Sequence, residues 1–229
     1  MVEMVVEQKA PAMQRLQAAV AAETAAQAEK AAAILDLAHE VNWLEGAEFE
    51  MIGRRPVRIG ADDTPLVDET LPLEIAALSG TSVAAATALI RVVLNLHHRH
   101  EHAWQAVGEG RVPLWRARQL TQLAETFDLG FGECMQVDAK IAPLLGMVGW
   151  GRVMARYRAA IIEVAPAKVA AQNARGRRNR HVTFGTDGDD PTLSWMSALA
   201  DTSDVKAFEH LLGLVAKALS ELGDTDPID

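Results

Sequence analysis

Two consecutive helix–glycine–helix patterns constrain the fold of this chain more than any other sequence feature. Residues 71–98 contain two apolar helical stretches separated at Gly80, and residues 102–127 repeat this arrangement around Gly110. Glycine reaches the positive φ angles that end helices, and small residues beside it allow two helices to cross closely. Alanine, the strongest helix former, supplies much of the 49% hydrophobic content, whereas aromatic residues make up only 5%. The sequence therefore predicts a mostly α fold, a multi-helix bundle that contains helix-turn-helix-like pairs.

The flanking segments divide the chain into three predicted parts. Residues 11–44 predict a long alanine-rich helix, in which Pro11 suits the first turn. Residues 45–68 are rich in glycine, proline and mixed charge and predict a loop. Near the C-terminus, Asp187-Gly188 is a strong turn signal between two short strands, and an amphipathic helix follows at residues 204–222. The predicted parts are an N-terminal long helix and loop (1–65), a helical core with a basic helix (66–180), and a β-hairpin with a C-terminal helix packed on that core (181–229).

Basic residues are concentrated in one segment of an acidic protein. The net charge of −9 argues against binding of nucleic acid by the whole surface. Residues 152–180, however, hold eight Lys and Arg residues against one acidic residue. Such a block can contact phosphate, because charges are screened beyond about 10 Å at physiological salt. The alternative is a solvated basic surface that pairs with the acidic flanks. The candidate phosphate contacts are Arg152, Arg156, Arg158, Lys168, Arg175, Arg177, Arg178 and Arg180.

The helix-turn-helix-like pairs offer few groups that could recognise bases. The exposed start of the helix after Gly80 carries mainly Ala, Ser and Thr, whereas specific base contacts usually come from Arg, Asn or Gln. Arg91 on that helix, together with Arg116 and Arg118 on the helix after Gly110, are candidates for secondary nucleic-acid contacts. We therefore expect the pairs to act chiefly as a scaffold.

Two polar clusters have a spacing that would suit metal ligands, but each can also be explained as an ordinary surface feature of a helix end or a turn. His98 and His102 lie four residues apart and can share one helical face, yet histidines are also favoured at the C-terminal end of a helix. We expect a solvated helix end at this cluster, which comprises His97, His98, His100 and His102. Asp187, Asp189 and Asp190 could hold a cation or form an ordinary turn. No nucleophile with its base and no carboxylate pair is recognisable, so the sequence predicts no catalytic, metal or cofactor site and leaves enzymatic activity open.

Cysteine content and apolar patterning indicate the compartment. Cys134 is the only cysteine and excludes an internal disulfide, as is typical of a reducing cytoplasm. The first ten residues, MVEMVVEQKA, contain acidic residues where a signal peptide needs basic ones. No apolar run approaches the roughly 18 residues of a membrane span. We expect a cytoplasmic protein that does not enter the membrane.

Four stretches give the chain a recognisable order of elements: LPLEIAALSGTSVAAATALIRVVLNL (71–96), GRVPLWRARQLTQLAET (110–126), AKVAAQNARGRRNRHVTF (167–184), and TLSWMSALADTSDVKAFEHLLGLVAKAL (192–219) followed by GDTDPID (223–229). Through them the chain resembles the actinobacterial domain of unknown function 222. The likeness covers about residues 66–229 and consists of a helical pattern, not of a catalytic motif. Members of that family commonly carry this domain before a C-terminal HNH endonuclease domain.

The resemblance implies a non-catalytic nucleic-acid-binding or targeting module of an HNH-endonuclease-type protein, with DNA as its partner. An HNH fold needs paired histidines and an asparagine on a ββα-metal scaffold, which these 229 residues lack. Any endonuclease activity is therefore expected in a C-terminal HNH domain that is absent from this chain. The alternative is a structural module that forms a homo-oligomer through the N-terminal alanine-rich helix and does not bind DNA.

Overall fold

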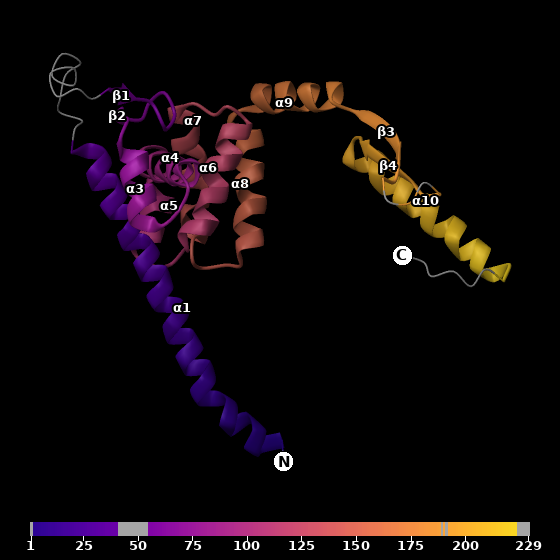
Figure 1. The fold of residues 1–229 in the computed structure, drawn as a ribbon, viewed down its shortest axis with the longest axis horizontal. Coiled ribbons are helices and arrows are strands. Elements are labelled where there is room, and N and C mark those ends of the chain that lie inside the picture. Colours follow the sequence, from indigo (N-terminus) through magenta and orange to yellow (C-terminus); the bar gives the residue numbers. More distant parts are fainter. Residues whose placement is uncertain (1, 41–54, 189, 191, 224–229) are drawn as a thin grey trace. The chain divides into compact units, whose positions relative to one another are not determined.

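The computed structural model describes residues 2–40, 55–188, 190 and 192–223, which form two compact units, Met1–Val169 and Ala170–Asp229 (Figure 1). The first unit is a helical bundle with one small sheet, and the second contains a two-stranded sheet and a helix. The predicted mostly α fold with a hairpin and helix near the C-terminus is thereby confirmed. Several predicted features lie outside the described residues: the end of the first helix (41–44), much of the following loop, Asp189 and the final GDTDPID segment beyond Gly223.

The helices after the small sheet follow one another with short connections. Helix α9 (Pro166–Arg178) begins in the first unit and ends in the second. The elements are α1 (Val2–His39), β1 (Pro56–Val57), β2 (Val67–Asp68), α3 (Leu71–Ser79), α4 (Val83–Arg99), α5 (Glu101–Gly108), α6 (Leu114–Thr126), α7 (Phe131–Ile141), the 3-10 helix η1 (Ala142–Leu144), α8 (Trp150–Val164) and α9 (Pro166–Arg178).

Both predicted glycine turns separate helices. Gly80 ends α3 with φ of +62°, and its N–H donates to the carbonyl of Ala76. Ser82 then caps α4, because its hydroxyl accepts a hydrogen bond of 3.2 Å from the N–H of Ala85. The axes of α3 and α4 are bent by 109° at this turn. Gly110, with φ of +70°, stands in the same way between α5 and α6.

Helix α4 supplies the centre of the core. It contacts α1, α3, α5, α6 and α7, which surround it in the bundle (Figure 1), and residues 92–96 in its C-terminal half are all buried. Ile90, Val93, Leu94 and Leu96 are all fully enclosed. Each such side chain contributes about 1.5–3 kcal/mol of burial free energy, so this helix anchors the bundle. Within the described residues no single helix is both long and apolar enough to cross a membrane, and only the bent α3–α4 pair meets that test when taken together.

Helix α1 differs from its prediction in where it begins and in how much of it packs. It begins at Val2, so Pro11 lies inside the helix instead of in its first turn. Its C-terminal part is packed through Ala31, Ile34, Leu35 and Ala38, whereas residues 11–23 are exposed all around. Only the C-terminal part of the helix therefore packs on the other helices of this unit, and the alanine-rich remainder extends beyond them (Figure 1).

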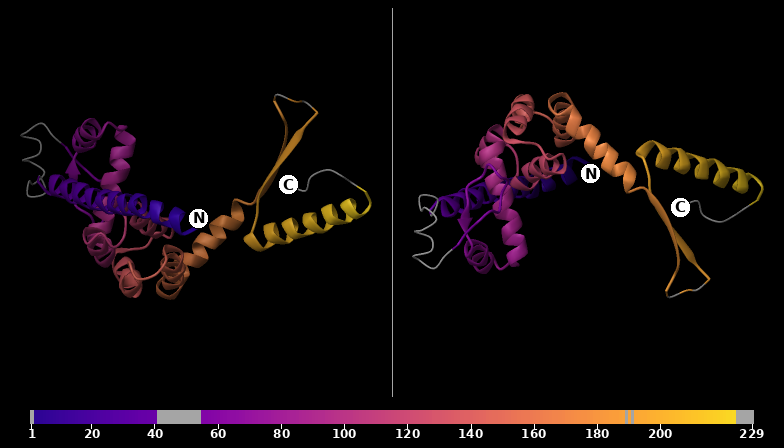
Figure 2. Two further views of the ribbon diagram at one scale, coloured as in Figure 1. Left: turned by 90° about the horizontal axis from the view of Figure 1, so that it is seen from below. Right: turned by 90° about the horizontal axis from the view of Figure 1, so that it is seen from above.

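The second unit contains the predicted hairpin and helix. Strands β3 (His181–Thr186) and β4 (Ser194–Leu199) are antiparallel, with His181 opposite Leu199, and form a two-stranded ribbon in both views of Figure 2. Helix α10 (Thr202–Glu221) follows. None of the described residues of the hairpin and α10 is buried, although many are apolar. The expected packing of this hairpin and helix on the helical core stays a prediction.

Candidate nucleic-acid interface

The cations of α8 differ in whether a carboxylate neutralises them. Arg156 pairs with Glu163 at 2.8 Å, and Lys140 of α7 reaches the other oxygen of that carboxylate at 2.9 Å. Hydrogen bonds from Arg156 and Lys140 lower the pKa of Glu163 to about 2. Arg152 and Arg158 are exposed and make no ion pair within the described residues. Of the three α8 candidates, these two remain available to an external anion.

Lys168 is engaged in holding α9 against α7. Its Nζ lies 2.6 Å from a carboxylate oxygen of Glu133 and donates to the carbonyl of Asp128 at 2.5 Å. The same carboxylate accepts the N–H of Gly130 at the start of α7. Burial alone would raise the pKa of Glu133, but the hydrogen bonds from Lys168 and Gly130 outweigh it and lower that pKa. Lys168 therefore stabilises the contact between α9 and α7, and a phosphate would have to compete with Glu133 to bind it.

The arginine run at the end of α9 is the least neutralised part of the predicted block. Arg175, Arg177 and Arg178 are exposed, and their guanidinium groups make no hydrogen bond or ion pair to any described residue. Arg180 instead pairs with Asp201 at 3.0 Å. Three cations within the last turn are also favoured by the helix dipole, which is negative at this end.

The eight predicted cations are divided between the two units. Arg152, Arg156, Arg158 and Lys168 belong to the first unit, whereas the run from Arg175 to Arg180 belongs to the second. The sequence places them in one segment of 29 residues, but ion pairs to Glu163, Glu133 and Asp201 occupy three of the eight.

The three secondary candidates have separate environments. Arg91 uses its Nε to donate to the Ile59 carbonyl at 2.9 Å, which ties α4 to the segment after β1. The guanidinium of Arg116 lies 5.0 Å from the ring centroid of Trp115, in a cation–π contact. Arg118 is exposed and lines a groove with Trp115.

A second cleft, which the sequence did not indicate, has a volume of about 710 Å³ in the first unit. Four cations and four carboxylates line it, so their charges balance. No linear pattern marks the cleft, because its residues come from segments near positions 60, 95, 125 and 168. The charged lining residues are Arg58, Arg91, Arg99, Lys168, Asp62, Asp63, Glu125 and Asp128.

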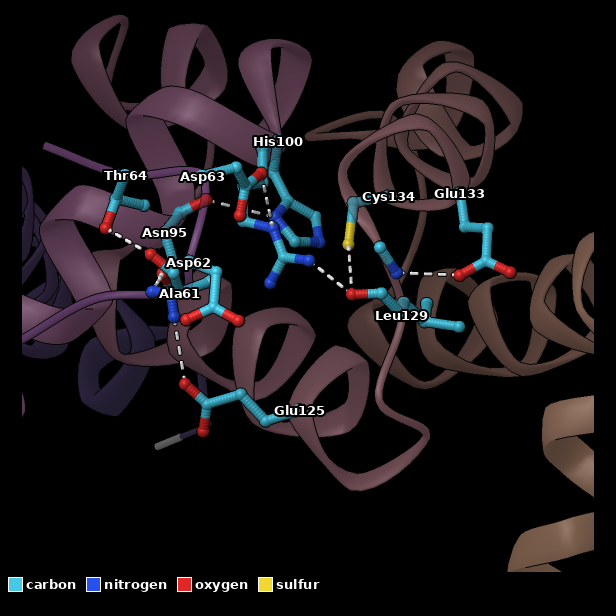
Figure 3. A network of polar contacts seen from close by, with 12 residues as sticks. Ala61, Asp62, Asp63, Thr64, Asn95, His100, Glu125, Leu129, Glu133 and Cys134 are labelled. Atoms are coloured by element: carbon cyan, nitrogen blue, oxygen red, sulfur yellow. Dashed lines mark hydrogen bonds and ion pairs between the residues drawn. The ribbon is translucent and has the colours of Figure 1, made fainter.

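Polar contacts across this cleft hold the loop before β2 in place (Figure 3). Asn95 accepts the N–H of Ala61 and donates to Glu125, both at 2.9 Å. Buried Arg99 donates to the Leu129 carbonyl, and its Nε lies 3.2 Å from the carboxylate of Asp63 without hydrogen-bond geometry. Because Asn95 and Arg99 already contact protein groups, and Asp63 offsets the charge of Arg99, the network is structural and adds little positive potential for a phosphate.

The expectation of a solvated histidine helix end is wrong for His100. This side chain is fully buried, with Nδ1 donating to the Asn95 carbonyl at 3.3 Å and Nε2 lying 2.8 Å from the Tyr157 hydroxyl. Burial lowers the pKa of His100 and so favours the neutral ring, and the Tyr157 hydroxyl also donates to the Leu120 carbonyl at 3.2 Å. A tertiary partner, Tyr157 of α8, therefore replaces solvent at this position.

The two histidines with metal-like spacing are not brought together. The Nδ1 of His102 lies 2.9 Å from buried Asp138, whose carboxylate also accepts the N–H groups of His102 and Ala103 at the start of α5. His98 instead lies with its Nε2 3.3 Å from that of His39 of α1. No group of three or more His, Cys, Asp or Glu side chains among the described residues is placed to hold a metal ion.

Comparisons with protein-family models, curated proteins and solved structures find no match for this chain.

Proposed function

We propose that this chain is a non-catalytic nucleic-acid-binding or targeting module. The observation that carries the proposal is the exposed set of Arg175, Arg177 and Arg178, whose guanidinium groups have no partner among the described residues. Unpaired guanidinium groups in one helical turn are suited to phosphate, which accepts two parallel hydrogen bonds from each. They provide affinity without reading sequence. Arg152 and Arg158 are further candidates of the same kind, whereas Arg156, Lys168 and Arg180 first have to leave a carboxylate.

The resemblance to the domain of unknown function 222 supports DNA as the partner. Under this proposal any endonuclease activity belongs to an HNH domain outside these 229 residues, and the present chain contributes binding or targeting. A cytoplasmic location is part of the proposal, since a lone buried cysteine such as Cys134 is ordinary in a reducing compartment.

The proposal is tested by measuring binding to fluorescent duplex DNA over a series of salt concentrations. Each phosphate contact adds roughly 0.9 to the slope of log K against log salt, so R175Q/R177Q/R178Q should reduce its magnitude by about 2 to 3. The control R15Q/K206Q/K217Q removes the same charge from exposed positions elsewhere and should leave the slope nearly unchanged. Absence of binding at low salt, or an equal effect of both triple variants, would contradict the proposal.

Helix α1 favours a second candidate function, self-association without DNA binding. Met13, Leu16 and Val20 are exposed on the part of the helix that extends beyond the bundle. At 3.6 residues per turn they lie on the same helical face as Ala31 and Ile34, which pack on the core. The apolar face thus continues past its intramolecular partner and is suited to a second copy of the same helix.

A further inference from the structure

A groove between α1, α4 and α6 has the composition of a site for a flat anionic ligand. Its volume is about 280 Å³. Leu89 and Val92 of α4 provide an apolar floor, Trp115 of α6 provides an aromatic wall, and Lys30 and Arg118 supply positive charge. No carboxylate lines the groove. All of its lining residues belong to the first unit, whereas the arginine run at the end of α9 belongs to the second.

Trp115 is placed for contact with something other than the core. The first turn of α6 buries Leu114 and Ala117, whereas 55% of Trp115 is exposed. The guanidinium of Arg116, 5.0 Å from its ring centroid, steadies the indole from the same helix. An exposed indole with a neighbouring cation is the usual platform for stacking an unpaired base.

The charges and the polar rim favour a nucleotide over a purely apolar ligand. Lys30 and Arg118 make no ion pair within the part of the chain that the structure describes, so both are available to phosphate. Gln27 donates through its amide nitrogen to Glu23 at 3.0 Å, which leaves its amide oxygen as an acceptor. Because Gln27 lines the groove, this acceptor is available to the N–H groups of a base edge. The volume is near the lower end of ligand sites, about 300–1,000 Å³, and fits one base.

We propose that this groove binds a single unpaired base of a nucleic-acid strand, stacked on Trp115, with the adjoining phosphates at Lys30 and Arg118. The inference rests on the proposed nucleic-acid binding and adds its substrate class, a strand with at least one unstacked base. Paired bases in an intact duplex have their faces covered by their neighbours, so a duplex cannot occupy the groove without flipping a base out.

The test compares three fluorescent ligands of equal length: a thymidine strand, a strand of abasic sites, and a blunt duplex. Stacking on an aromatic side chain contributes about 1–3 kcal/mol per base, so W115A should bind the thymidine strand roughly 5- to 150-fold more weakly. The same variant should bind the abasic strand and the duplex as the wild type does. W115Y, which keeps an aromatic face, should recover most of the affinity.

A matched control keeps structural effects apart from stacking. F131A removes another exposed aromatic side chain, 52% accessible, from the start of α7 and should leave binding of all three ligands unchanged. Equal weakening of thymidine and abasic binding by W115A, or no effect of W115A on either, overturns the inference and assigns the groove to another occupant. Absence of binding of every ligand at low salt overturns the proposed function itself, so the two failures are distinguishable.

Discussion

The role of each basic residue depends on the acceptors that the fold places beside it. Arg99 donates to the Leu129 carbonyl, and Arg91 donates to that of Ile59. Lys168 is shared between the Asp128 carbonyl and the Glu133 carboxylate. A cation that donates to protein oxygens has replaced part of its water shell with these contacts, and a phosphate that binds the same N–H groups must displace them. Counting Lys and Arg along the sequence therefore overestimates the cations that are available to nucleic acid.

We expect the folded protein to lose stability in acid because three histidines pack together where α1 meets α4. The rings of His97 and His98 lie 4.7 Å apart, and His39 packs edge-on against both. Burial, with the neighbouring His97 and His39, lowers the pKa of His98 to about 4, and burial also lowers that of His97. Because the unfolded chain takes up these protons near pH 6.5, folding stability should be fully present above that pH and fall as the pH drops toward about 4. Urea unfolding at pH 7.5 and pH 5 measures the difference.

The variant H98Q should reduce this pH dependence, since it removes the titrating ring from the junction. The matched variant H210Q, at an exposed position of α10, should keep the wild-type dependence. An identical drop in unfolding free energy for wild type and H98Q would show that His98 does not contribute.

At the scale of elements, helix ends are fixed partly by neighbours in sequence and partly by distant residues. The end of α3 and the start of α4 are determined by adjacent residues, since Gly80 forms the turn and Ser82 caps α4. The start of α5 is determined by a residue distant in sequence, because the buried carboxylate of Asp138 in α7 accepts the N–H groups of His102 and Ala103. Helix ends that adjacent residues determine can be predicted from sequence, whereas helix ends that distant residues determine depend on how the helices pack.

Gly80→Ala should destabilise the protein by about 1–2 kcal/mol. A Cβ at Gly80 would meet no neighbour, so the cost arises from placing alanine at φ of +62°. Gly108→Ala is the matched control, because Gly108 also has open space around it but lies within α5 without a positive φ. Alanine should be neutral or stabilising there. Chemical denaturation of both variants distinguishes backbone strain from a general effect of added bulk.

At the scale of the whole molecule, the two units differ in how many of their apolar side chains are buried. The buried apolar residues of the described chain all lie between Ala31 and Ala165, whereas the hairpin and α10 leave theirs exposed. The first unit therefore has a core of its own. The second unit has apolar faces on its strands and on α10, and a lone two-stranded hairpin is marginally stable in water.

Self-association through α1 predicts a dimer or higher oligomer in solution. M13Q/L16Q/V20Q should shift the protein to a monomer, because it removes the exposed apolar face that lies in line with the core-facing residues. A18Q/A22Q/A25Q changes the opposite face of the same exposed helix and should leave the oligomer intact. Light scattering after size exclusion measures the mass. A monomeric wild type would rule out this role for α1.

The sequence by itself determined the helix content, the two glycine turns, the hairpin at Asp187-Gly188 and the segment in which cations are concentrated. These features follow from the conformational preferences of neighbouring residues, which act locally. Only the tertiary structure decided which cations are paired, that His100 is enclosed beside Tyr157, and that Lys30 and Trp115 line one groove. Those outcomes join residues that are tens of positions apart, and helix packing alone sets the distance between them.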